Sequence, residues 1–108
     1  MENVDIEDLK ELVNKGHIVW TEHVALRLLQ RDIKRADVLS CIQTGEIIEQ
    51  YPTDKPFPSC LILGKSTIGN DMHVVCGLDK GVICYGITAY YPSLEKWEDD
   101  LKTRKEGN

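Results

Sequence analysis

Three side chains four residues apart, His23, Arg27 and Arg31, have the types and the spacing that could carry chemistry. Residues four apart lie on one face of an α-helix, so a helix through this segment holds one imidazole and two guanidiniums in a single row. Histidine exchanges protons near neutral pH, and arginine remains cationic and binds planar anions. The row is therefore suited to an anion, and phosphate is the leading candidate.

The apolar residues around this row predict the elements that must position it. They recur at helical spacing in three segments, which are residues 5–15, 21–31 and 35–44. Asp5 and Thr21 are suitable N-caps for the first two helices, because their side-chain oxygens can accept the free N–H groups of a first turn. Gly45 is a suitable end for the third helix. Between the first two helices, residues 17–20 form a short β-prone segment.

After the third helix, the pattern changes to one of strands and turns. The expected strands are residues 46–51, 60–65, 72–78 and 82–91. Pro92 and Ser93 open a last predicted helix, with Leu94, Trp97 and Leu101 on one side. This order predicts an α+β fold, in which N-terminal helices pack on a four-stranded antiparallel sheet and a short C-terminal helix follows.

The turn between the last two strands decides which residue faces His73. A three-residue loop that ends at Gly81, which supplies the left-handed conformation, pairs His73 with Ile87. A two-residue loop instead places His73 opposite Thr88. Because a shift of one residue moves a side chain to the other face, the sequence leaves open whether His73 shares a face with Thr88 and Tyr90.

Length and composition predict one domain over residues 1–108. The chain is 42% apolar and 29% charged, which is ordinary for a soluble protein that buries a core. No apolar run approaches the roughly 20 residues that a membrane helix needs. The acidic first residues lack the basic and apolar segments of a signal peptide. We therefore expect a cytoplasmic protein with no membrane partner.

The formal net charge of −5 argues against a strong, non-specific nucleic-acid binder, because phosphate binding normally needs surplus positive charge. The acidic excess is concentrated near the two ends, and residues 17–92 carry 7 basic and 8 acidic residues. Within them Arg27, Arg31, Lys34 and Arg35 lie close together. A local basic patch is therefore expected on an acidic protein.

The cysteines and histidines give little support to a metal site. Cys41, Cys60, Cys76 and Cys84 form no Cys-x-x-Cys pair, and each lies among aliphatic residues, as buried free thiols usually do. The three histidines, at positions 17, 23 and 73, lack the spacing of a ligand set. We expect no metal and no cofactor.

Several short motifs occur in a fixed order along residues 18–98. They are TEHVALR (21–27), QRDI (30–33), GEIIEQYP (45–52), PFPSCLILG (56–64), MHVV (72–75), ITAYYP (87–92) and Trp97. As an ordered set they resemble an uncharacterised bacterial family, the domain-of-unknown-function 4258 group. That family resembles the small toxin ribonucleases grouped with RelE, barnase and the colicin nuclease domains, which pair N-terminal helices with an antiparallel sheet.

The resemblance implies a site on the exposed face of the sheet. Carried over motif by motif, its catalytic residues are His23, Arg27 and His73, and its substrate-binding residues are Arg31, Tyr51, Thr88 and Tyr90. The chain departs from the family pattern at Asp32, where glycine is usual, and at Lys34, where a serine-type cap is usual. Both departures bear on the position of Arg31 more than on those of His23 and Arg27.

The function that the resemblance implies is metal-independent RNA cleavage. His23 and His73 would be the acid–base pair for the 2′-hydroxyl and the leaving oxygen, and Arg27 would stabilise the phosphorane charge. The alternative is a non-catalytic interaction domain that keeps the fold, antitoxin-like or an inactive relative, and a metal hydrolase ranks third. The expected partners are RNA, an antitoxin or a second copy of the chain.

Each candidate residue also has a purely structural interpretation. His23 could be an ordinary surface histidine, Arg27 could pair with Glu22, and His73 could cap the sheet edge. The tyrosines could be core or rim aromatics. Whether the rings of His23 and His73 face a common site separates the catalytic interpretation from the structural one.

Overall fold

The three helices expected in the first half of the chain are present in the computed structural model, which describes residues 3–106. They are α1 (Ile6–Asn14), α2 (Glu22–Gln30) and α3 (Arg35–Thr44). Asp5 and Thr21 accept backbone N–H groups of the first turns at 2.9 and 3.2 Å, so both predicted N-caps are confirmed. Residues 1–2 and 107–108, at the ends of the expected domain 1–108, lie outside the described residues.

Among the described residues the sheet has five strands, where four were predicted. They are β1 (Ile18–Trp20), β2 (Glu46–Tyr51), β3 (Ser59–Lys65), β4 (Asp71–Asp79) and β5 (Ile83–Tyr90), in the order β1-β5-β4-β3-β2. The four predicted strands form antiparallel pairs, but β1 adds to β5 in a parallel pair at the edge. The expectation of a wholly antiparallel, four-stranded sheet was therefore wrong, because it left out β1. A segment of three residues shows too little alternation to be recognised as a strand, and its partner is more than sixty residues away.

Neither predicted register of the β4–β5 hairpin is correct. Asp79 pairs with Ile83 near the turn, whereas His73 pairs with Tyr90 at the far end. The pairing shifts between Val75 and Cys76, where Ile87 is the extra residue of a β-bulge. His73 consequently lies directly beside Tyr90, and the same face carries Thr88, which is opposite Val75.

The predicted C-terminal helix is also wrong. A single turn follows Ser93, and the chain then reverses so that Trp97 pairs with Arg104 in an antiparallel bridge. The Asp100 carboxylate accepts two of the backbone N–H groups that follow it, and such local bonding competes with helix formation. Leu101 has a φ of 59°, a left-handed conformation that does not occur inside a right-handed helix. Apolar residues at helical spacing were misleading here.

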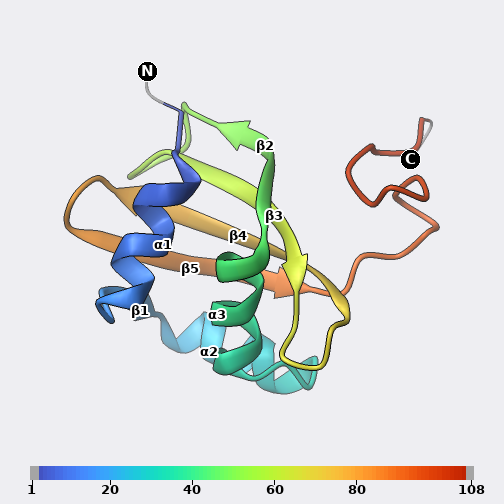
Figure 1. Cartoon of the computed structure of the whole chain (residues 1–108), viewed down its shortest axis with the longest axis horizontal. Helices are drawn as coiled ribbons and strands as arrows, with labels where there is room; N and C mark the ends of the chain where they lie inside the picture. Colours follow the sequence, from blue (N-terminus) through green and yellow to red (C-terminus); the bar gives the residue numbers. More distant parts are fainter. Residues whose placement is uncertain (1–2, 107–108) are drawn as a thin grey trace.

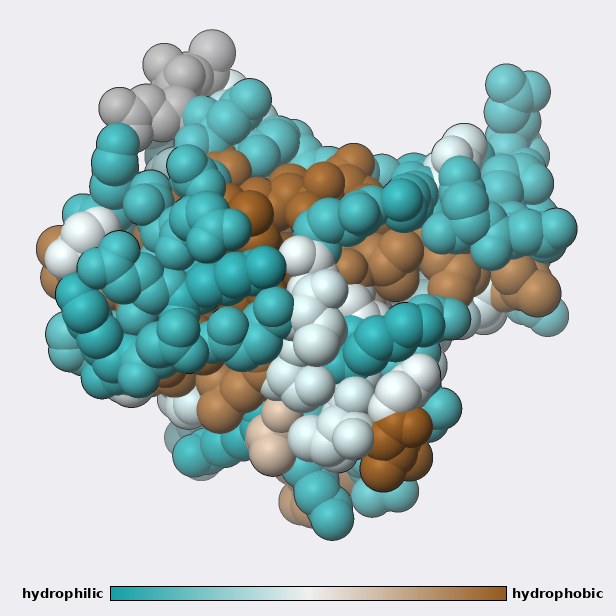
Figure 2. All heavy atoms as spheres, viewed as in Figure 1, coloured by the Kyte–Doolittle hydropathy of each residue, from teal (hydrophilic) through white to brown (hydrophobic). Residues whose placement is uncertain are grey.

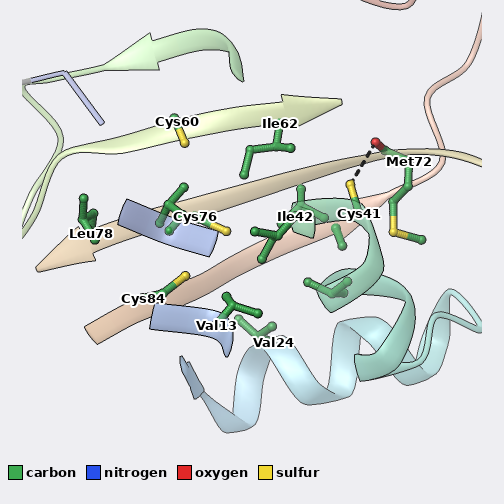
Figure 3. Packing of buried hydrophobic residues seen from close by; sticks show 14 of the residues in the cluster. Val13, Val24, Cys41, Ile42, Cys60, Ile62, Met72, Cys76, Leu78 and Cys84 are labelled. Atoms are coloured by element: carbon green, nitrogen blue, oxygen red, sulfur yellow. Dashed lines mark hydrogen bonds between the residues drawn. The ribbon is translucent and has the colours of Figure 1, made fainter. Parts of the chain in front are cut away.

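The main core lies between the sheet and the three helices. Side chains from β3, β4 and β5 point toward those of α1, α2 and α3 (Figure 3). All four cysteines are buried free thiols, as predicted, and the Cys41 thiol donates to the carbonyl oxygen of Met72 at 3.3 Å. Burial raises the pKa of both Cys41 and Cys60 to about 12, so these thiols are inert structural groups.

The two faces of the sheet differ in what covers them. Helices α1 and α3 lie side by side over one face, and α2 packs against β5 (Figure 1). On this helix-covered side, hydrophilic side chains predominate over α1 (Figure 2). The opposite face, here called the open face, is partly covered by the C-terminal segment, residues 91–106. Within residues 3–106, no helix has the length and apolar character needed to cross a membrane.

Helix α3 and strand β3 approach so closely that only glycine fits between them. A Cβ atom at Gly64 would lie 2.1 Å from the carbonyl oxygen of Cys41, whereas one at Gly77 would lie no closer than 3.5 Å to its nearest neighbour, Ile87. The first distance is a clash with backbone, and the second is ordinary van der Waals contact.

We therefore expect Gly64→Ala to lower the free energy of unfolding by at least about 1 kcal/mol, because α3 or β3 must move away to make room for the methyl group. Gly77→Ala is the matched control and should change it by less than about 1 kcal/mol. Urea denaturation of the two variants beside the wild type measures both values. Equal stabilities for the two variants would contradict the close approach of α3 to β3.

Candidate functional site

His73 is fully buried, and both of its ring nitrogens are hydrogen-bonded inside the protein. Nε2 lies 2.7 Å from the carbonyl oxygen of Leu101, and Nδ1 lies 3.1 Å from the hydroxyl oxygen of Tyr90. Because a carbonyl oxygen only accepts, Nε2 must carry the proton, and Nδ1 then accepts the proton of the Tyr90 hydroxyl. Burial is the main cause that lowers the pKa of His73 below 6.5, so the ring is neutral at neutral pH.

The C-terminal segment closes over this histidine. The ring of Trp97 meets the His73 ring edge to face, with centroids 4.5 Å apart and planes at 89°. Trp97 is itself buried, and together with Leu101 it covers the end of the open face where His73 lies. The Tyr90 ring packs against the same imidazole at 5.3 Å. His73 therefore orients Tyr90 from behind and has no surface of its own toward solvent.

Arg31 reaches the open face from the C-terminal end of α2. Its Nη1 donates to the Thr88 hydroxyl at 3.0 Å and to the carbonyl oxygen of Ala89 at 2.8 Å. These two bonds use both hydrogens of Nη1. The three remaining N–H groups of the guanidinium have no partner among residues 3–106. Arg31 is thus held in place while more than half of its donors stay available.

A second arginine comes from the C-terminal segment. Arg104 forms a two-pronged pair with Glu49, with Nε–Oε2 at 2.9 Å and Nη2–Oε1 at 3.0 Å, and its guanidinium lies 4.7 Å from the centroid of the Trp97 ring. The hydroxyl of Tyr51 also donates to Glu49. The hydrogen bonds from Arg104 are the main cause that lowers the pKa of Glu49, and burial with this carboxylate raises that of Tyr51 to about 12. Glu49 is therefore ionised and committed to these two partners.

These groups border one cavity of about 400 Å³, which we call the arginine–tyrosine pocket. Its lining residues are Arg31, Tyr90, Tyr91, Ser93, Lys96, Trp97 and Arg104. No carboxylate is among them, and the Lys96 ammonium has no hydrogen bond or ion pair with the rest of the chain that the structure describes. Because Glu49 offsets only the charge of Arg104, the pocket carries surplus positive charge on a chain whose net charge is −5.

His23 and Arg27 lie outside this pocket. His23 is exposed and borders a different cavity, of about 500 Å³, at the start of α2. Arg27 is exposed one turn further along, and its guanidinium has no hydrogen bond or ion pair with another residue in the range 3–106. His23 and His73 therefore do not face a common site, since His73 is buried behind the tyrosine of the arginine–tyrosine pocket.

Five of the seven residues that the resemblance implied therefore lie at or next to this pocket. Four of them form two contacting pairs, and the fifth, Tyr51, is linked less directly. Arg31 contacts Thr88, and His73 contacts Tyr90, while Tyr51 reaches the pocket only through Glu49 and Arg104. Sequence reasoning missed Lys96, which lies within the expected C-terminal helix, and Arg104, which follows its last named residue, Leu101. Their basic character was a signal, but nothing in their spacing indicated that this segment returns to the sheet.

Across residues 3–106, His, Cys, Asp and Glu side chains nowhere gather in groups of three or more that could hold a metal ion. The chemistry of the arginine–tyrosine pocket is instead that of cationic N–H donors beside phenol and indole rings. Such a set binds oxyanions and stacks on planar rings, and within it the Tyr90 hydroxyl is linked to the imidazole of His73.

Comparison with known protein families identifies the family of this chain. Residues 20–91, about two thirds of the chain, match the model of a family described as "Domain of unknown function (DUF4258)". This range contains all seven residues that the resemblance implied. Searches of curated proteins and of solved structures found no match.

The buried, neutral state of His73 predicts a loss of stability in mild acid. The pKa of this group is lower in the folded chain than its ordinary value of 6.5, so its contribution to stability is complete above pH 6.5 and is lost as the pH falls through the folded pKa. We expect the free energy of unfolding of His73→Gln to fall less steeply than that of the wild type below pH 6.5. Urea titrations at several pH values measure this dependence.

The matched control is His23→Gln, which removes an exposed histidine. Its stability should follow the wild-type pH dependence. If the free energy of unfolding of His73→Gln falls with pH as steeply as that of the wild type, the buried imidazole is not the cause of the acid sensitivity.

Proposed function

The chain belongs to the family of the domain of unknown function DUF4258, and we propose that it is a metal-independent endoribonuclease whose reaction takes place in the arginine–tyrosine pocket. The single observation that supports this most is the hydrogen bond from the Tyr90 hydroxyl to Nδ1 of His73. It links a phenol that borders a cationic pocket to a buried proton acceptor whose tautomer is set by the carbonyl of Leu101. A hydroxyl joined to an oriented imidazole is a recurrent arrangement for proton transfer.

The proposed binding step uses the cations. A phosphate of the RNA backbone accepts hydrogen bonds from the free N–H groups of Arg31 and from the Lys96 ammonium. Arg104 also lines the pocket, and its charge is offset by Glu49. Since Arg31 is already fixed by Thr88 and Ala89, its donors are oriented before the phosphate arrives.

The proposed chemical step is attack of the 2′-hydroxyl oxygen on the adjacent phosphorus. The proton of this hydroxyl passes to the Tyr90 oxygen while the Tyr90 proton passes to Nδ1 of His73. The bond from phosphorus to the 5′-oxygen breaks, and this oxygen takes a proton from the Lys96 ammonium. The products are a 2′,3′-cyclic phosphate and a free 5′-hydroxyl, and the imidazolium and the lysine later return to their starting states through solvent.

Two features of Tyr90 suit this role. Burial raises the pKa of its hydroxyl, so the phenol carries its proton at neutral pH and hands it on only as it receives another. The imidazolium formed at His73 keeps its bond to the Leu101 carbonyl, and the carboxylate of Glu49 favours the charged ring. His73 acts through Tyr90 and does not touch the substrate, so it is a positioning and proton-accepting residue.

Binding without cleavage is the second candidate function. The pocket of Arg31, Lys96 and Arg104 can hold a phosphate whether or not a proton moves, and the proton acceptor behind it has no exposed surface. A protein partner that carries phosphate or carboxylate groups is compatible with the same cations. Cleavage and binding are separated by the following two experiments.

The first experiment is cleavage of a labelled single-stranded RNA in excess EDTA. We expect Tyr90→Phe to lose at least about 10²-fold in rate, because it removes the hydroxyl that relays the proton. Tyr91→Phe removes the neighbouring hydroxyl, which has no hydrogen bond with any residue in the described part of the chain, and should lose far less. The same oligonucleotide with deoxyribose at the cleaved position should remain intact.

Equal rates for Tyr90→Phe and the wild type would remove Tyr90 from the reaction. If the wild-type protein cleaves no RNA but binds it, the second candidate function replaces the first.

The second experiment measures binding of a 2′-O-methyl RNA oligonucleotide, which cannot be cleaved by this route, through fluorescence anisotropy. We expect Arg31→Gln to weaken binding about tenfold or more and to reduce the slope of log affinity against log salt by about 0.7, which corresponds to one phosphate contact on a single strand. Lys10→Gln removes a charge from α1, away from the pocket, and is the control. Equal losses for the two variants would indicate that only the net charge matters.

A further inference from the structure

A second cavity, of about 500 Å³, lies on the open face at the start of α2 and has no part in the proposed reaction. It is bordered by the first turn of α2, by the loop between β2 and β3, and by the middle of β4 and β5. Its lining residues are Thr21, His23, Val24, Asp54, Lys55, Pro56, Phe57, Gly77, Tyr85, Gly86 and Ile87. None of them borders the arginine–tyrosine pocket.

The floor of this cavity exists because position 77 has no side chain. A Cβ atom at Gly77 would lie 3.5 Å from Cδ1 of Ile87 and 3.7 Å from Cβ of Tyr85, which are both lining residues. These are ordinary contact distances, so a methyl group could be accommodated by the fold but would occupy space in the cavity. The hydrogen at Gly77 leaves that space to a ligand.

The wall is a pair of aromatic rings that are already stacked. Phe57 and Tyr85 have centroids 5.3 Å apart and planes only 9° from parallel. Ile87, 41% exposed, adds an aliphatic surface beside them. Flat carbon surfaces of this kind suit a planar ring, because bases of single-stranded RNA bind by stacking on aromatic side chains.

The rim carries groups that could read the edge of such a ring. The imidazole ring of His23 has no hydrogen bond with any residue between 3 and 106, so both ring nitrogens are available. The Asp54 carboxylate accepts a hydrogen bond from the Ser59 hydroxyl at 2.6 Å through Oδ2, which orients it, while Oδ1 has no partner in the described part of the chain. The Lys55 ammonium completes a rim with both donors and acceptors. A purely aliphatic ligand would leave these groups unpaired, whereas the edge of a nucleobase can pair with them.

The cavity also lies along the path that the proposed substrate would follow. His23 borders this cavity, Arg31 borders the arginine–tyrosine pocket, and Arg27 is midway between them on α2. Four residues of an α-helix rise about 6 Å, so His23 and Arg31 lie about 12 Å apart along α2, with the Arg27 guanidinium between them. A strand whose backbone passes Arg27 could occupy both cavities.

We propose that this cavity binds one base of the RNA strand whose phosphate lies in the arginine–tyrosine pocket. The proposal rests on the proposed function for the identity of the ligand, but it concerns separate residues. Phe57 and Tyr85 supply the stacking surface, Gly77 the space, and His23 with Asp54 the contacts to the edge of the base. His23 then contributes to base selection instead of proton transfer.

The test is a titration of the ¹⁵N-labelled protein with adenosine, guanosine, cytidine and uridine, followed by ¹H–¹⁵N NMR spectra. Nucleosides have no phosphate, so binding reports on the base cavity alone. We expect at least one nucleoside to shift the amide signals of Gly77 and Gly86 and to leave that of Lys96 unchanged. Gly77→Ala should weaken this binding tenfold or more while the variant keeps the wild-type melting temperature to within a few degrees.

A second variant, Phe57→Leu, should also weaken nucleoside binding, and Val82→Ala, an exposed position that borders neither cavity, should not. The absence of nucleoside-induced shifts at Gly77 and Gly86, or unchanged affinity in folded Gly77→Ala, would overturn the proposal. So would binding of N-acetyl-leucinamide in place of every nucleoside, which would assign the cavity to a peptide.

An abasic ribose-phosphate oligomer separates this proposal from the proposed function. If the abasic oligomer binds with dependence on Arg31 and no nucleoside binds, the base cavity is wrong and the phosphate site stands. If nucleosides bind as expected and the abasic oligomer does not bind, the base cavity stands and the proposed function fails.

Discussion

The extra residue at Ile87 in β5 determines which side chains meet on the open face. Before the bulge, Cys84 and Gly86 belong to the helix-covered face; after it, Ala89 does. Without the bulge, strict alternation would turn Tyr90 into the core, and Ala89 would face outward. A single backbone irregularity therefore brings Tyr90 beside His73, and the contacts of Trp97 and the C-terminal segment depend on that arrangement.

The C-terminal segment is held against the sheet by polar groups whose burial without a partner would cost stability. The Nε2–H group of His73 is buried and needs an acceptor, and the carbonyl oxygen of Leu101 provides it. Glu49 and Arg104 form a second attachment, on the neighbouring part of the open face. Both attachments lie after Trp97, on the part of the segment that returns to the sheet. The bonds that satisfy His73 and Glu49 therefore also hold Trp97 and Arg104 at the pocket.

The sequence predicted correctly those features that depend on interactions between residues close together in the chain. The N-caps at Asp5 and Thr21 and the end of α3 at Gly45 were correct, and the four longer strands were placed to within about a residue at most ends. These features follow from side chains and periodicity within a few residues, which a sequence shows directly.

The features that were missed depend on contacts between distant segments. The partner of β1 is more than sixty residues away, and a bulge at Ile87 leaves an alternating pattern that is readable in two registers. Leu94, Trp97 and Leu101 have the spacing of a helix, but they belong to a segment that reverses direction and packs on the sheet. Candidate residues were accordingly easier to identify than their grouping, and Arg31 and Tyr90 proved to be neighbours while His23 lies at another cavity.

The contact between Arg31 and Ala89 has a further consequence, for self-association. Strand β1 covers β5 only as far as Gly86, so within residues 3–106 the outer edge of β5 beyond Gly86 has no neighbouring strand. An uncovered edge is a template on which another chain can add a strand, and proteins often block it with a charged side chain. The guanidinium of Arg31 occupies the carbonyl oxygen of Ala89 at that edge. One side chain thus both presents a charge to the pocket and occupies an edge carbonyl oxygen that an added strand would need.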